Sequence, residues 1–576
     1  MTIRDRWLVP ALAVLFVAVS TLALAPSFGP GDALSSAAPT FVTARRYSEG
    51  VVGHATNASP FGARSAADRE LVALLFRGLV RLGPDRTIVG DLASSWEVDP
   101  SGGSWTFHLR PGMRWQDGQP ITSDDVVFTI STLADPGYTG PGAESWREVT
   151  AISVDSLTVT LRLATPLGGF LQAATQPIAP AHLLADVPPA DLPASAFGMH
   201  PVGSGPFRLV TLDERRAVLD AARPVVAAAS SAPGASPSGA SPTSSAGPDD
   251  AFPLPYLAGI EFDYFDDGAA LETAWNRGAL DAASGLTPAE AATLGATPGA
   301  RLLRYPSSTL LAVDLNLRAG HTTFTDPAVR RALLEALDRN AILGDPLLGF
   351  GAAAEGLIPA WAPEFDPTAN PAVPFDATAA QAALVKAGWK KTSGGWIPKG
   401  ATAPLNLTLL SADAATNAVA FETADAVANA WRAIGLTVTH VSLPAGELLA
   451  DRLRPGDYEA AVVPLLIGLD PDVYPLLASS QTRTGGANLS GVQDVALDTL
   501  LSAARAPGTP EGRLAAYKAL ETRLSSSLYI LPLAFRDEVV VLRGTVQGPA
   551  PRPVGGPGDR FWDVLTWRLA AAPTSS

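Results

Sequence analysis

Apolar and polar residues alternate along several short stretches of this chain, and a period of two predicts a β-strand. The alternation runs from Ser104 to Leu109 and again from Ser156 to Leu163. Residues 205–221, 257–265 and 436–443 show the same alternation next to turn residues, so each of them predicts further strand structure.

Other stretches place apolar residues three and four positions apart behind a capping side chain, which predicts helices with one buried face. We expect such helices behind a cap at Thr122 or Ser123, behind Asp326 with Pro327 at the first helical position, from Asp376 to Gly388, and in the segment that ends at Gly435. Strands follow some of these helices directly after a glycine, and this order predicts an α/β fold.

The N-terminus has a different pattern, because Arg4 and Arg6 precede an apolar run over residues 7–25. At about 1.5 Å per residue a helix of this length spans about 28 Å, close to the hydrocarbon core of a membrane. We expect residues 1–26 to be a retained membrane anchor or a cleaved signal peptide. Pro26 disfavours cleavage directly before it, although a later site stays open. Either alternative places the bulk of the chain outside the cytoplasm.

Two segments are rich in Gly, Ala, Ser and Pro. Residues 27–45 are expected to form a flexible spacer, with folded sequence beginning near Tyr47. Residues 223–250 hold too few large apolar side chains to order themselves. Because strands are predicted on both sides of residues 223–250, we favour an insertion at a hairpin tip over a linker between domains.

Composition narrows the class of protein. A chain of 576 residues is long enough for more than one packed lobe. Its net charge of −15 disfavours nucleic acid as a partner, because phosphate binding needs a basic face. The absence of cysteine excludes disulfides, thiolate catalysis, cysteine-ligated metals and the acylated cysteine that tethers bacterial lipoproteins.

Motifs of common enzymes are absent from the sequence. It contains no G-x-S-x-G, no G-x-G-x-x-G and no P-loop, so we expect no catalytic residues and no cofactor. The histidines do not form an H-x-x-x-H or H-E-x-x-H pair, which makes a helical zinc site improbable; they stand at positions 54, 108, 182, 200, 321 and 440.

Four segments, in the same order, resemble the extracellular solute-binding proteins of family 5, the peptide/nickel class that feeds ABC importers. The resemblance runs through residues 74–130, which include "SWTFHLRPGMRWQDGQPITSDDVVFTI", through "HPVGSGPFRLV" at 200–210, through residues 313–342, and through "FDATAAQAALVKAGW" at 375–389. It is collinear over about 500 residues. It also leaves open a nickel chelate held by one histidine, for which His54 would be the candidate.

The resemblance implies an α/β fold with two lobes, of the type II periplasmic-binding-protein kind, with an extra subdomain in the first lobe and a ligand cleft between the lobes. By this pattern lobe I comprises residues 46–60, 195–311 and 536–570, the accessory subdomain residues 61–194, and lobe II residues 312–535.

The function implied is reversible capture of a small ligand by closure of the lobes, followed by delivery to an ABC permease. An oligopeptide is the first expectation for the ligand. The protein is expected to act as a monomer, attached to the membrane through its N-terminal segment. The alternative is a membrane-anchored ligand sensor or scaffold that keeps the binding fold without transport.

Candidate ligand-binding residues come from segments that the resemblance places at the cleft. They are Thr56 and Asn57 after the first strand, Tyr305, Ser307 and Ser308 in the segment that crosses between the lobes, Trp361 in a proline-rich loop, and Asp470, Asp472 and Tyr474 in "GLDPDVYP". For each of them, local turn bonding or packing is the alternative. The aspartate that anchors a peptide amino group in the family would fall at Ile467, and Asp470 or Asp472 would replace it if the loop is shifted. Trp431 is assigned to the core.

Overall fold

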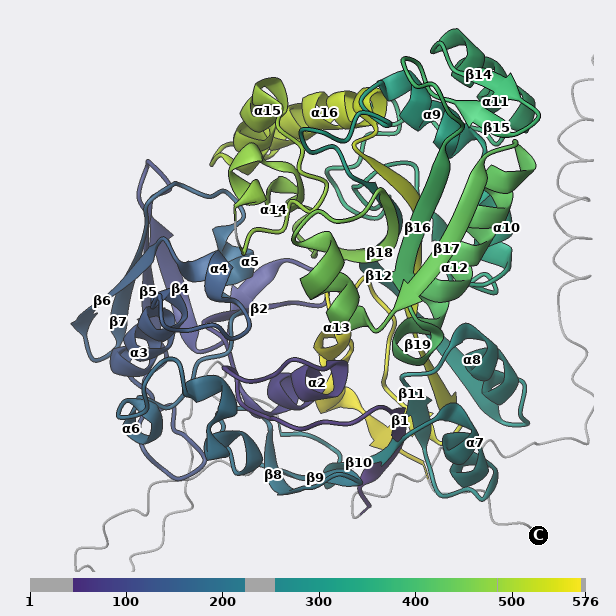
Figure 1. Ribbon diagram of the computed structural model, residues 1–576. Coiled ribbons are helices and arrows are strands. Elements are labelled where there is room, and N and C mark those ends of the chain that lie inside the picture. The colour runs from purple at the N-terminus through teal and green to yellow at the C-terminus, as the bar shows by residue number, and fades with distance from the viewer. Residues whose placement is uncertain (1–44, 223–253, 484, 571–576) are drawn as a thin grey trace, which may run out of the picture. The chain divides into compact units, whose positions relative to one another are not determined.

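The computed structural model describes residues 45–222, 254–483 and 485–570. In these residues an eleven-stranded mixed sheet has the order β17-β16-β18-β12-β19-β11-β1-β10-β9-β8, and β13 pairs with β19 (Figure 1). The strands of this sheet are β1 (Tyr47–Val52), β8 (Phe207–Leu212), β9 (Arg216–Ala221), β10 (Gly259–Phe265), β11 (Ala282–Ser284), β12 (Ala300–Leu315), β13 (Gly351–Ala353), β16 (Asn406–Ala412), β17 (Thr437–Leu443), β18 (Ala460–Leu466) and β19 (Ile530–Arg543).

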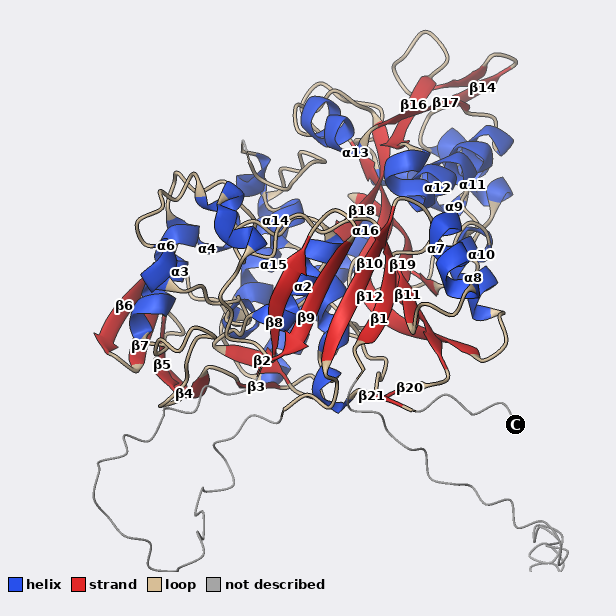
Figure 2. Ribbon diagram, turned by 90° about the horizontal axis from the view of Figure 1, so that it is seen from below, coloured by secondary structure: helices blue, strands red, loops and turns tan. Residues whose placement is uncertain are grey.

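A separate four-stranded antiparallel sheet, in the order β4-β5-β7-β6, lies apart from the large sheet (Figure 2). Its strands are β4 (Ala93–Val98), β5 (Ser104–Leu109), β6 (Val149–Asp155) and β7 (Thr158–Leu163). Three two-stranded antiparallel sheets complete the described strands: β2 (Val80–Leu82) with β3 (Ile88–Gly90), β14 (Lys390–Thr392) with β15 (Gly395–Ile397), and β20 (Val546–Gln547) with β21 (Arg568–Leu569).

Helices cover both faces of the large sheet. The α-helices are α2 (Ala66–Leu75), α3 (Ser123–Ala134), α4 (Ala143–Trp146), α5 (Phe170–Ala173), α6 (Ala181–Leu184), α7 (Gly268–Asn276), α8 (Pro288–Gly295), α9 (Pro327–Glu335), α10 (Arg339–Gly344), α11 (Ala377–Lys386), α12 (Ala414–Ala433), α13 (Ala445–Glu447), α14 (Tyr474–Leu477), α15 (Val495–Arg505) and α16 (Pro510–Ser527). Shorter helical turns are η1 (Leu192–Ala194), η2 (Ala196–Met199), the π-helical η3 (Leu448–Leu453), η4 (Ser479–Thr482), η5 (Pro557–Phe561) and η6 (Val564–Thr566).

The helix starts predicted from capping residues are confirmed. Thr122 caps α3. Its backbone N–H donates to the side chain of Asp125, which completes a capping box. Asp326 caps α9 with Pro327 at the first helical position, and Asp376 caps α11. These side chains satisfy N–H groups that a helix leaves without partners at its start.

Strands β12 and β19 run through the whole large sheet and join its two halves. In one half, β12 and β19 pair near β11 and β1; in the other they lie beside β18 and β16. The register of the β12–β19 pairing shifts between Pro306 and Leu310, so the ladder is irregular there. An interruption of this kind allows a long strand to bend.

Separate apolar cores form around the two halves of the sheet. In one half, α9, α11 and α12 cover one face and α14, α15 and α16 cover the other. Residues of β12 alternate between these cores, with Leu311 and Val313 in one and Leu310 and Ala312 in the other. Trp431 is fully buried and its Nε1 donates to the carbonyl of Leu333, which confirms that it belongs to the core.

Predictions for the termini and the insertion have different outcomes. The first described strand, β1, begins at Tyr47. Strands β9 and β10, which flank the low-complexity insertion, pair antiparallel as expected for a hairpin. Three predicted segments lie outside the described residues: the anchor at 1–26, the spacer at 27–45 except for Arg45, and the whole insertion at 223–250. Among the helices that are described, none has both the length and the apolar character needed to cross a membrane.

Candidate functional site

Polar side chains follow one face of the large sheet toward the carboxyl ends of its parallel strands. Strand β1 pairs in parallel with β10 and β11, and Val51 lies opposite both Tyr264 and Ser284. Residues directly opposite each other share a face of a sheet. Glu49 lies on the same face two residues earlier. Because ligands of open α/β sheets bind beyond the carboxyl ends of the strands, this edge is the first place to look for a site.

Glu49, Glu70 and Arg560 form a buried charged cluster on this face. Arg560 Nη2 donates to Glu49 Oε1 over 2.7 Å, and its Nε donates to Glu70 Oε1 over 2.8 Å. Tyr47 Oη donates to Glu49 Oε2 over 2.8 Å. Glu70 comes from α2 and Arg560 from η5, so the cluster fastens both elements to the sheet. Burial raises the pKa of Glu70 to about 7, although Arg560 opposes the shift.

Two hydroxyl groups next to this cluster are buried without a hydrogen-bond partner in the described structure. They are Tyr264 Oη and Ser284 Oγ, on residues that are 7% and 5% exposed. The charges of Glu70, Asp68 and Glu49 raise the pKa of Tyr264 in addition to its burial, so its hydroxyl lies within electrostatic reach of these carboxylates. An unsatisfied buried hydroxyl is costly and requires an explanation.

Farther along the same face, Arg536 and Glu538 of β19 reach the irregular part of the ladder. Ala282 lies opposite Leu542, so the even-numbered residues of β19 share the face of Glu49. Both side chains are half-buried, and neither forms a hydrogen bond or ion pair with another described residue. A cavity of about 140 Å³ adjoins this part of β19 and is lined by Gly285, Leu286, Pro288, Ala291, Leu347, Phe350 and residues 536–539. Four of these residues, Leu286, Ala291, Phe350 and Val539, belong to the core on the opposite face of the sheet.

Ser307 and Ser308, predicted as ligand contacts, are 3% and 0% exposed and bond to other parts of the chain. Ser307 Oγ accepts from the N–H of Thr309 over 3.1 Å. Ser308 Oγ accepts from the N–H of Gly468 and donates to the carbonyl of Gly555. The crossing segment is thereby fixed to the loop that carries Asp470 and to the C-terminal segment. Tyr305 is 1% exposed and belongs to the core around β1.

Asp470 and Asp472 are each held by an arginine. Asp470 forms an ion pair with Arg513, which also bonds Glu364 over 2.9 Å. Asp472 pairs with Arg505 over 2.9 Å and accepts the backbone N–H of Tyr474 over 3.0 Å. Burial raises the pKa of both aspartates, while the arginines oppose the shift. The two carboxylates therefore shape the turn before α14 and have their charges compensated within the protein.

Tyr474 and Trp361, the aromatic candidates, each stack with an arginine. Arg505 lies 4.3 Å from the centre of the Tyr474 ring, and Arg86 lies 5.6 Å from that of Trp361. Nε1 of Trp361 is buried and has no hydrogen-bond partner in the described residues. Ligand contact by either ring stays a prediction.

The loop before α5 makes close contact with the Asp470 turn and the end of α15. The N–H of Gly168 donates to the carbonyl of Arg505 over 2.8 Å. A Cβ added at Gly169 would stand 1.6 Å from Asp470 Oδ2, so a larger residue at that position requires the Asp470 carboxylate to shift. This contact joins the part of the chain that carries the four-stranded sheet to the part that carries α14–α16.

Thr56 and Asn57 lie in the loop after β1. Their backbone N–H groups donate to Asp68 Oδ1 over 2.7 and 3.0 Å. The Asn57 side-chain amide donates to the carbonyl of Pro193 and accepts from the N–H of Ser59. Both polar groups of this amide therefore have partners within the protein. Thr56 is exposed. Their predicted ligand contact is untested, and Asn57 has a clear structural role.

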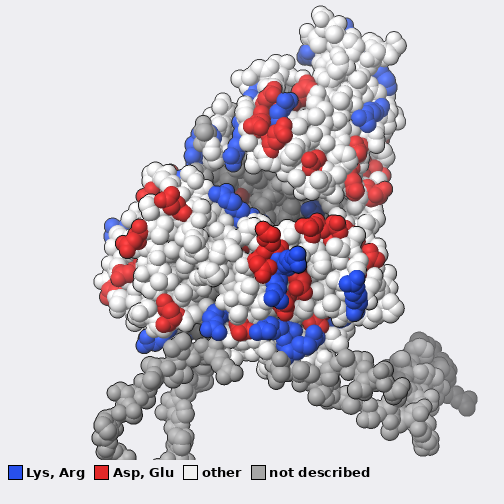
Figure 3. Space-filling view, turned by 60° about the horizontal axis from the view of Figure 1, so that its bottom comes forward, with Lys and Arg blue, Asp and Glu red and all other residues white. Residues whose placement is uncertain are grey.

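One face of the molecule is hollowed between an upper and a lower mass, and acidic side chains line the lower rim of the hollow (Figure 3). Across the described ranges no group of three or more His, Asp or Glu residues lies close enough to hold a metal ion. His54 bonds Asp266 over 2.9 Å and the carbonyl of Glu214 over 3.0 Å.

Sequence reasoning missed the residues that the structure assembles at the sheet edge: Glu49, Glu70, Tyr264, Ser284, Arg536, Glu538 and Arg560. The available signal was the stretch "RDEVVV", residues 536–541, because a strand there places Arg536 and Glu538, two positions apart, on one face. The partnership of Glu49 with Arg560 spans 511 positions and leaves no local pattern.

Comparisons with known proteins agree with this architecture. The family model described as "Bacterial extracellular solute-binding proteins, family 5 Middle" matches residues 87–488. Protein XP55 of Streptomyces lividans is 29% identical over 567 residues, which cover 97% of this chain and 92% of that protein.

Two solved structures share the fold. The oligopeptide-binding protein AppA from Bacillus subtilis, in complex with a nonapeptide, has a TM-score of 0.73 at 21% identity and covers 92% of this chain and 99% of its own. NikZ from Campylobacter jejuni, in complex with Ni(L-His), has a TM-score of 0.72 at 21% identity over 91% and 99%. The predicted α/β fold of these binding proteins is therefore confirmed.

Proposed function

Because this chain belongs to family 5 of the bacterial extracellular solute-binding proteins, we propose that it captures a small solute by lobe closure and delivers it to an ABC importer. The family consists of binding proteins and not of enzymes, so the work of the protein is reversible capture. A ligand that contacts both lobes stabilises the closed form, and the membrane complex distinguishes that form from the open one.

The lobes we propose keep the boundaries expected from the sequence. Lobe I comprises 46–60, 195–311 and 536–570, with 61–194 as its accessory subdomain, and lobe II comprises 312–535. Under this division β12 and β19 are the connections that bend on closure, since their pairing is irregular between Pro306 and Leu310.

The contact of Gly168 and Gly169 with Arg505 and Asp470 is the observation that carries this proposal. It brings the accessory subdomain and lobe II together without a covalent link and through few groups. A small contact of this kind can form and break as the hinge bends, which is what a capture mechanism requires.

Peptides are the first ligands to test. One structural relative is an oligopeptide-binding protein solved with a nonapeptide, and another was solved with Ni(L-His). A thermal-shift screen of the full-length chain with short peptides, amino acids and nickel–histidine tests the proposal. A solute present at 100 times its dissociation constant should add about 2.7 kcal/mol to the free energy of unfolding.

Transport is tested separately from binding. If the chain serves an ABC importer, deletion of its gene abolishes uptake of the solute that stabilises the purified protein. Unchanged uptake together with an altered cellular response to that solute would instead support a membrane-anchored sensor. A chain that no solute stabilises would contradict both functions.

A further inference from the structure

The amino-terminal edge of the lobe I half of the sheet, at the strand ends away from the candidate site, is rich in arginine. The parallel strands β1, β10 and β11 begin at this edge, and β12 begins beside them, where Ala300 lies opposite Arg543. Basic side chains gather at the lower end of the described surface in Figure 3. The arginines of the described segments that reach this edge form what we call the basic edge: Arg45, Arg46, Arg208, Arg277, Arg301, Arg543 and Arg568.

Carboxylates balance only part of this charge. In the same described segments the acidic residues are Asp220 and Asp281, and each already has an arginine partner. Asp281 pairs with Arg45 over 2.5 Å, and Asp220 pairs with Arg46 over 2.6 Å. Glu261, farther along β10, pairs with an arginine outside the basic edge. The basic edge is therefore positive, on a chain whose net charge is −15.

The other arginines of the basic edge add charge without a carboxylate in these segments to neutralise it. Arg301 and Arg543 donate to backbone carbonyls over 3.0 and 2.7 Å, and a carbonyl satisfies a donor without cancelling its charge. Arg208 and Arg277 are exposed. A concentration of one sign of charge on one face attracts partners of the opposite sign.

Two large apolar side chains are exposed at the same edge. Leu254 and Tyr256 are 54% and 48% exposed and directly precede β10. The guanidinium of Arg568 lies 3.8 Å from the centre of the Tyr256 ring. Tyrosine beside arginine is the combination that proteins place at the boundary between lipid and water, because each side chain has an apolar body and a polar end.

The tether of the chain also ends at the basic edge. Arg45 is the first described residue, and the sequence predicts a membrane anchor at residues 1–26 followed by a flexible spacer. A flexible segment of the length of residues 27–44 has a root-mean-square span of about 25 Å. A retained anchor would therefore hold this edge, rather than the candidate site at the other end of the strands, close to the membrane surface.

We propose that the basic edge of lobe I rests on the membrane surface, with its arginines against anionic phospholipid headgroups and with Leu254 and Tyr256 at the lipid–water boundary. Anionic lipid supplies the negative charge that the protein does not provide at this edge. In this orientation the carboxyl ends of β1, β10 and β11 point away from the membrane, so the candidate site is open to solutes in the surrounding medium.

The test uses the full-length chain in vesicles of phosphatidylcholine alone and of phosphatidylcholine mixed with phosphatidylglycerol. Because the chain has no cysteine, Asn276→Cys, exposed beside Arg277, carries a single donor dye, and an acceptor is attached to the lipid. Energy transfer should be higher in the anionic vesicles. It should fall to the phosphatidylcholine value at 1 M NaCl, where the screening length is about 3 Å. A second donor position, Lys399→Cys in lobe II, should show no such increase.

Charge-neutral variants identify the arginines responsible. Arg208→Gln combined with Arg277→Gln should lower the ratio of docked to undocked protein at least fivefold, because each arginine near an anionic surface contributes about a fivefold factor. The matched control combines Arg162→Gln on β7 with Arg454→Gln after η3, which removes the same charge from exposed positions elsewhere. Energy transfer that does not depend on lipid charge, or an equal loss in both pairs of variants, would overturn the proposal.

Discussion

At the scale of single residues, the notable feature of this protein is that its cores contain buried charged side chains as well as apolar ones. The Glu49–Arg560–Glu70 cluster lies within the core around β1 and fastens α2 and η5 to the sheet. Arg330 is also buried, and it donates only to backbone carbonyls, among them those of Phe324 and Ser527. Burial lowers the pKa of Arg330 to about 10, which leaves it charged at neutral pH. Such groups are stable only while every partner stays in place.

Replacement of Arg560 by Met should destabilise the protein by about 3–5 kcal/mol, because it leaves two buried carboxylates without their counter-charge. Urea unfolding followed by circular dichroism measures the change. The matched control is Arg277→Met at the exposed C-terminal end of α7, which should stay within about 0.5 kcal/mol of wild type. An Arg560→Met protein as stable as that control would show that the cluster contributes no net stability.

Stability should fall as the pH rises from about 4.5 to 7. Burial raises the pKa of Glu70 and of Glu521 from 4.5 to about 7, and that of Asp314 from 3.8 to about 6. A carboxyl whose pKa is higher in the folded state binds its proton more tightly there, so folding is favoured where the proton is bound. Thermal unfolding at pH 5.5 and pH 8 should therefore give the higher melting temperature at pH 5.5.

Glu521→Gln removes the titrating group and should reduce this pH dependence, although its single amide oxygen can replace only one of the two carboxylate oxygens that accept from Asn370 and from the N–H of Asp366. An exposed carboxyl such as Glu272 serves as the control, since its replacement by Gln should leave the dependence unchanged. A melting temperature that rises from pH 5.5 to pH 8 would show that these carboxyls are ionised in the folded protein at both values.

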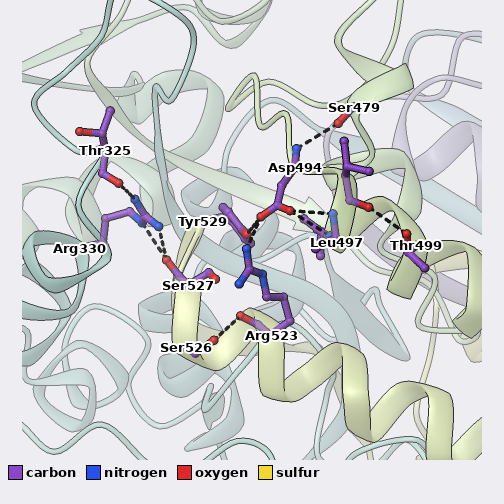
Figure 4. A network of polar contacts seen from close by, with 12 residues as sticks. Thr325, Arg330, Ser479, Asp494, Leu497, Thr499, Arg523, Ser526, Ser527 and Tyr529 are labelled. Carbon is purple, nitrogen blue, oxygen red and sulfur yellow. Dashed lines mark hydrogen bonds and ion pairs between the residues drawn. The ribbon is translucent and has the colours of Figure 1, made fainter.

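At the scale of elements, side chains near helix ends fix where the helices stand. Asp494 caps α15 by accepting the N–H groups of Ala496 and Leu497, and its other oxygen accepts from Arg523 and Tyr529 (Figure 4). These hydrogen bonds lower the pKa of Asp494 to about 2, against the effect of burial. One carboxylate thus joins the start of α15, the helix α16 and the start of β19.

Asp494→Ala should lower the free energy of unfolding by about 1–2 kcal/mol, because it removes a helix cap and leaves Arg523 and Tyr529 without their acceptor. Thr499→Ala on the same helix is the control: its hydroxyl bonds only the carbonyl of Val495 on an exposed face, so the expected change is within about 0.5 kcal/mol. Equal effects of the two substitutions in chemical denaturation would refute the role assigned to Asp494.

Gly169→Ala should weaken solute binding about tenfold while changing the stability of the unliganded protein little. The added methyl group meets Asp470 and disfavours the contact that, in the proposed mechanism, forms on closure. The nearby Gly508→Ala is the matched control, because nothing lies within 4 Å of its added Cβ. Titration calorimetry with the stabilising solute compares the two variants, and unchanged affinity of Gly169→Ala would remove this contact from the closing mechanism.

The sequence predicted elements better than sites, and the reason is physical. Strand alternation and helix caps are local, so β5 and the starts of α3, α9 and α11 could be read directly. The charged cluster and the row of Val51, Tyr264 and Ser284 depend on strand order, which places segments more than 200 positions apart side by side. The loop candidates Ser307, Ser308 and Asp470 were chosen for polarity, and the structure shows that each already has a partner inside the protein.

At the scale of the whole molecule, the account rests on closure of two lobes about β12 and β19. Arrangement and family agree with that motion: a continuous sheet carries both halves, and the proposed accessory subdomain meets lobe II through non-covalent contacts of Gly168 and Arg86. The chain contains no cysteine, so two can be introduced for site-specific dyes without removing any. Asp186 and Lys399 are exposed positions for this purpose, one in each of the parts expected to approach.

Single-molecule energy transfer between dyes at Asp186→Cys and Lys399→Cys measures closure most directly. The solute that stabilises the protein in the thermal screen should convert a broad or low-efficiency population into one with higher efficiency, with a midpoint equal to the dissociation constant from calorimetry. An efficiency distribution that stays unchanged while that solute saturates the protein would contradict capture by closure.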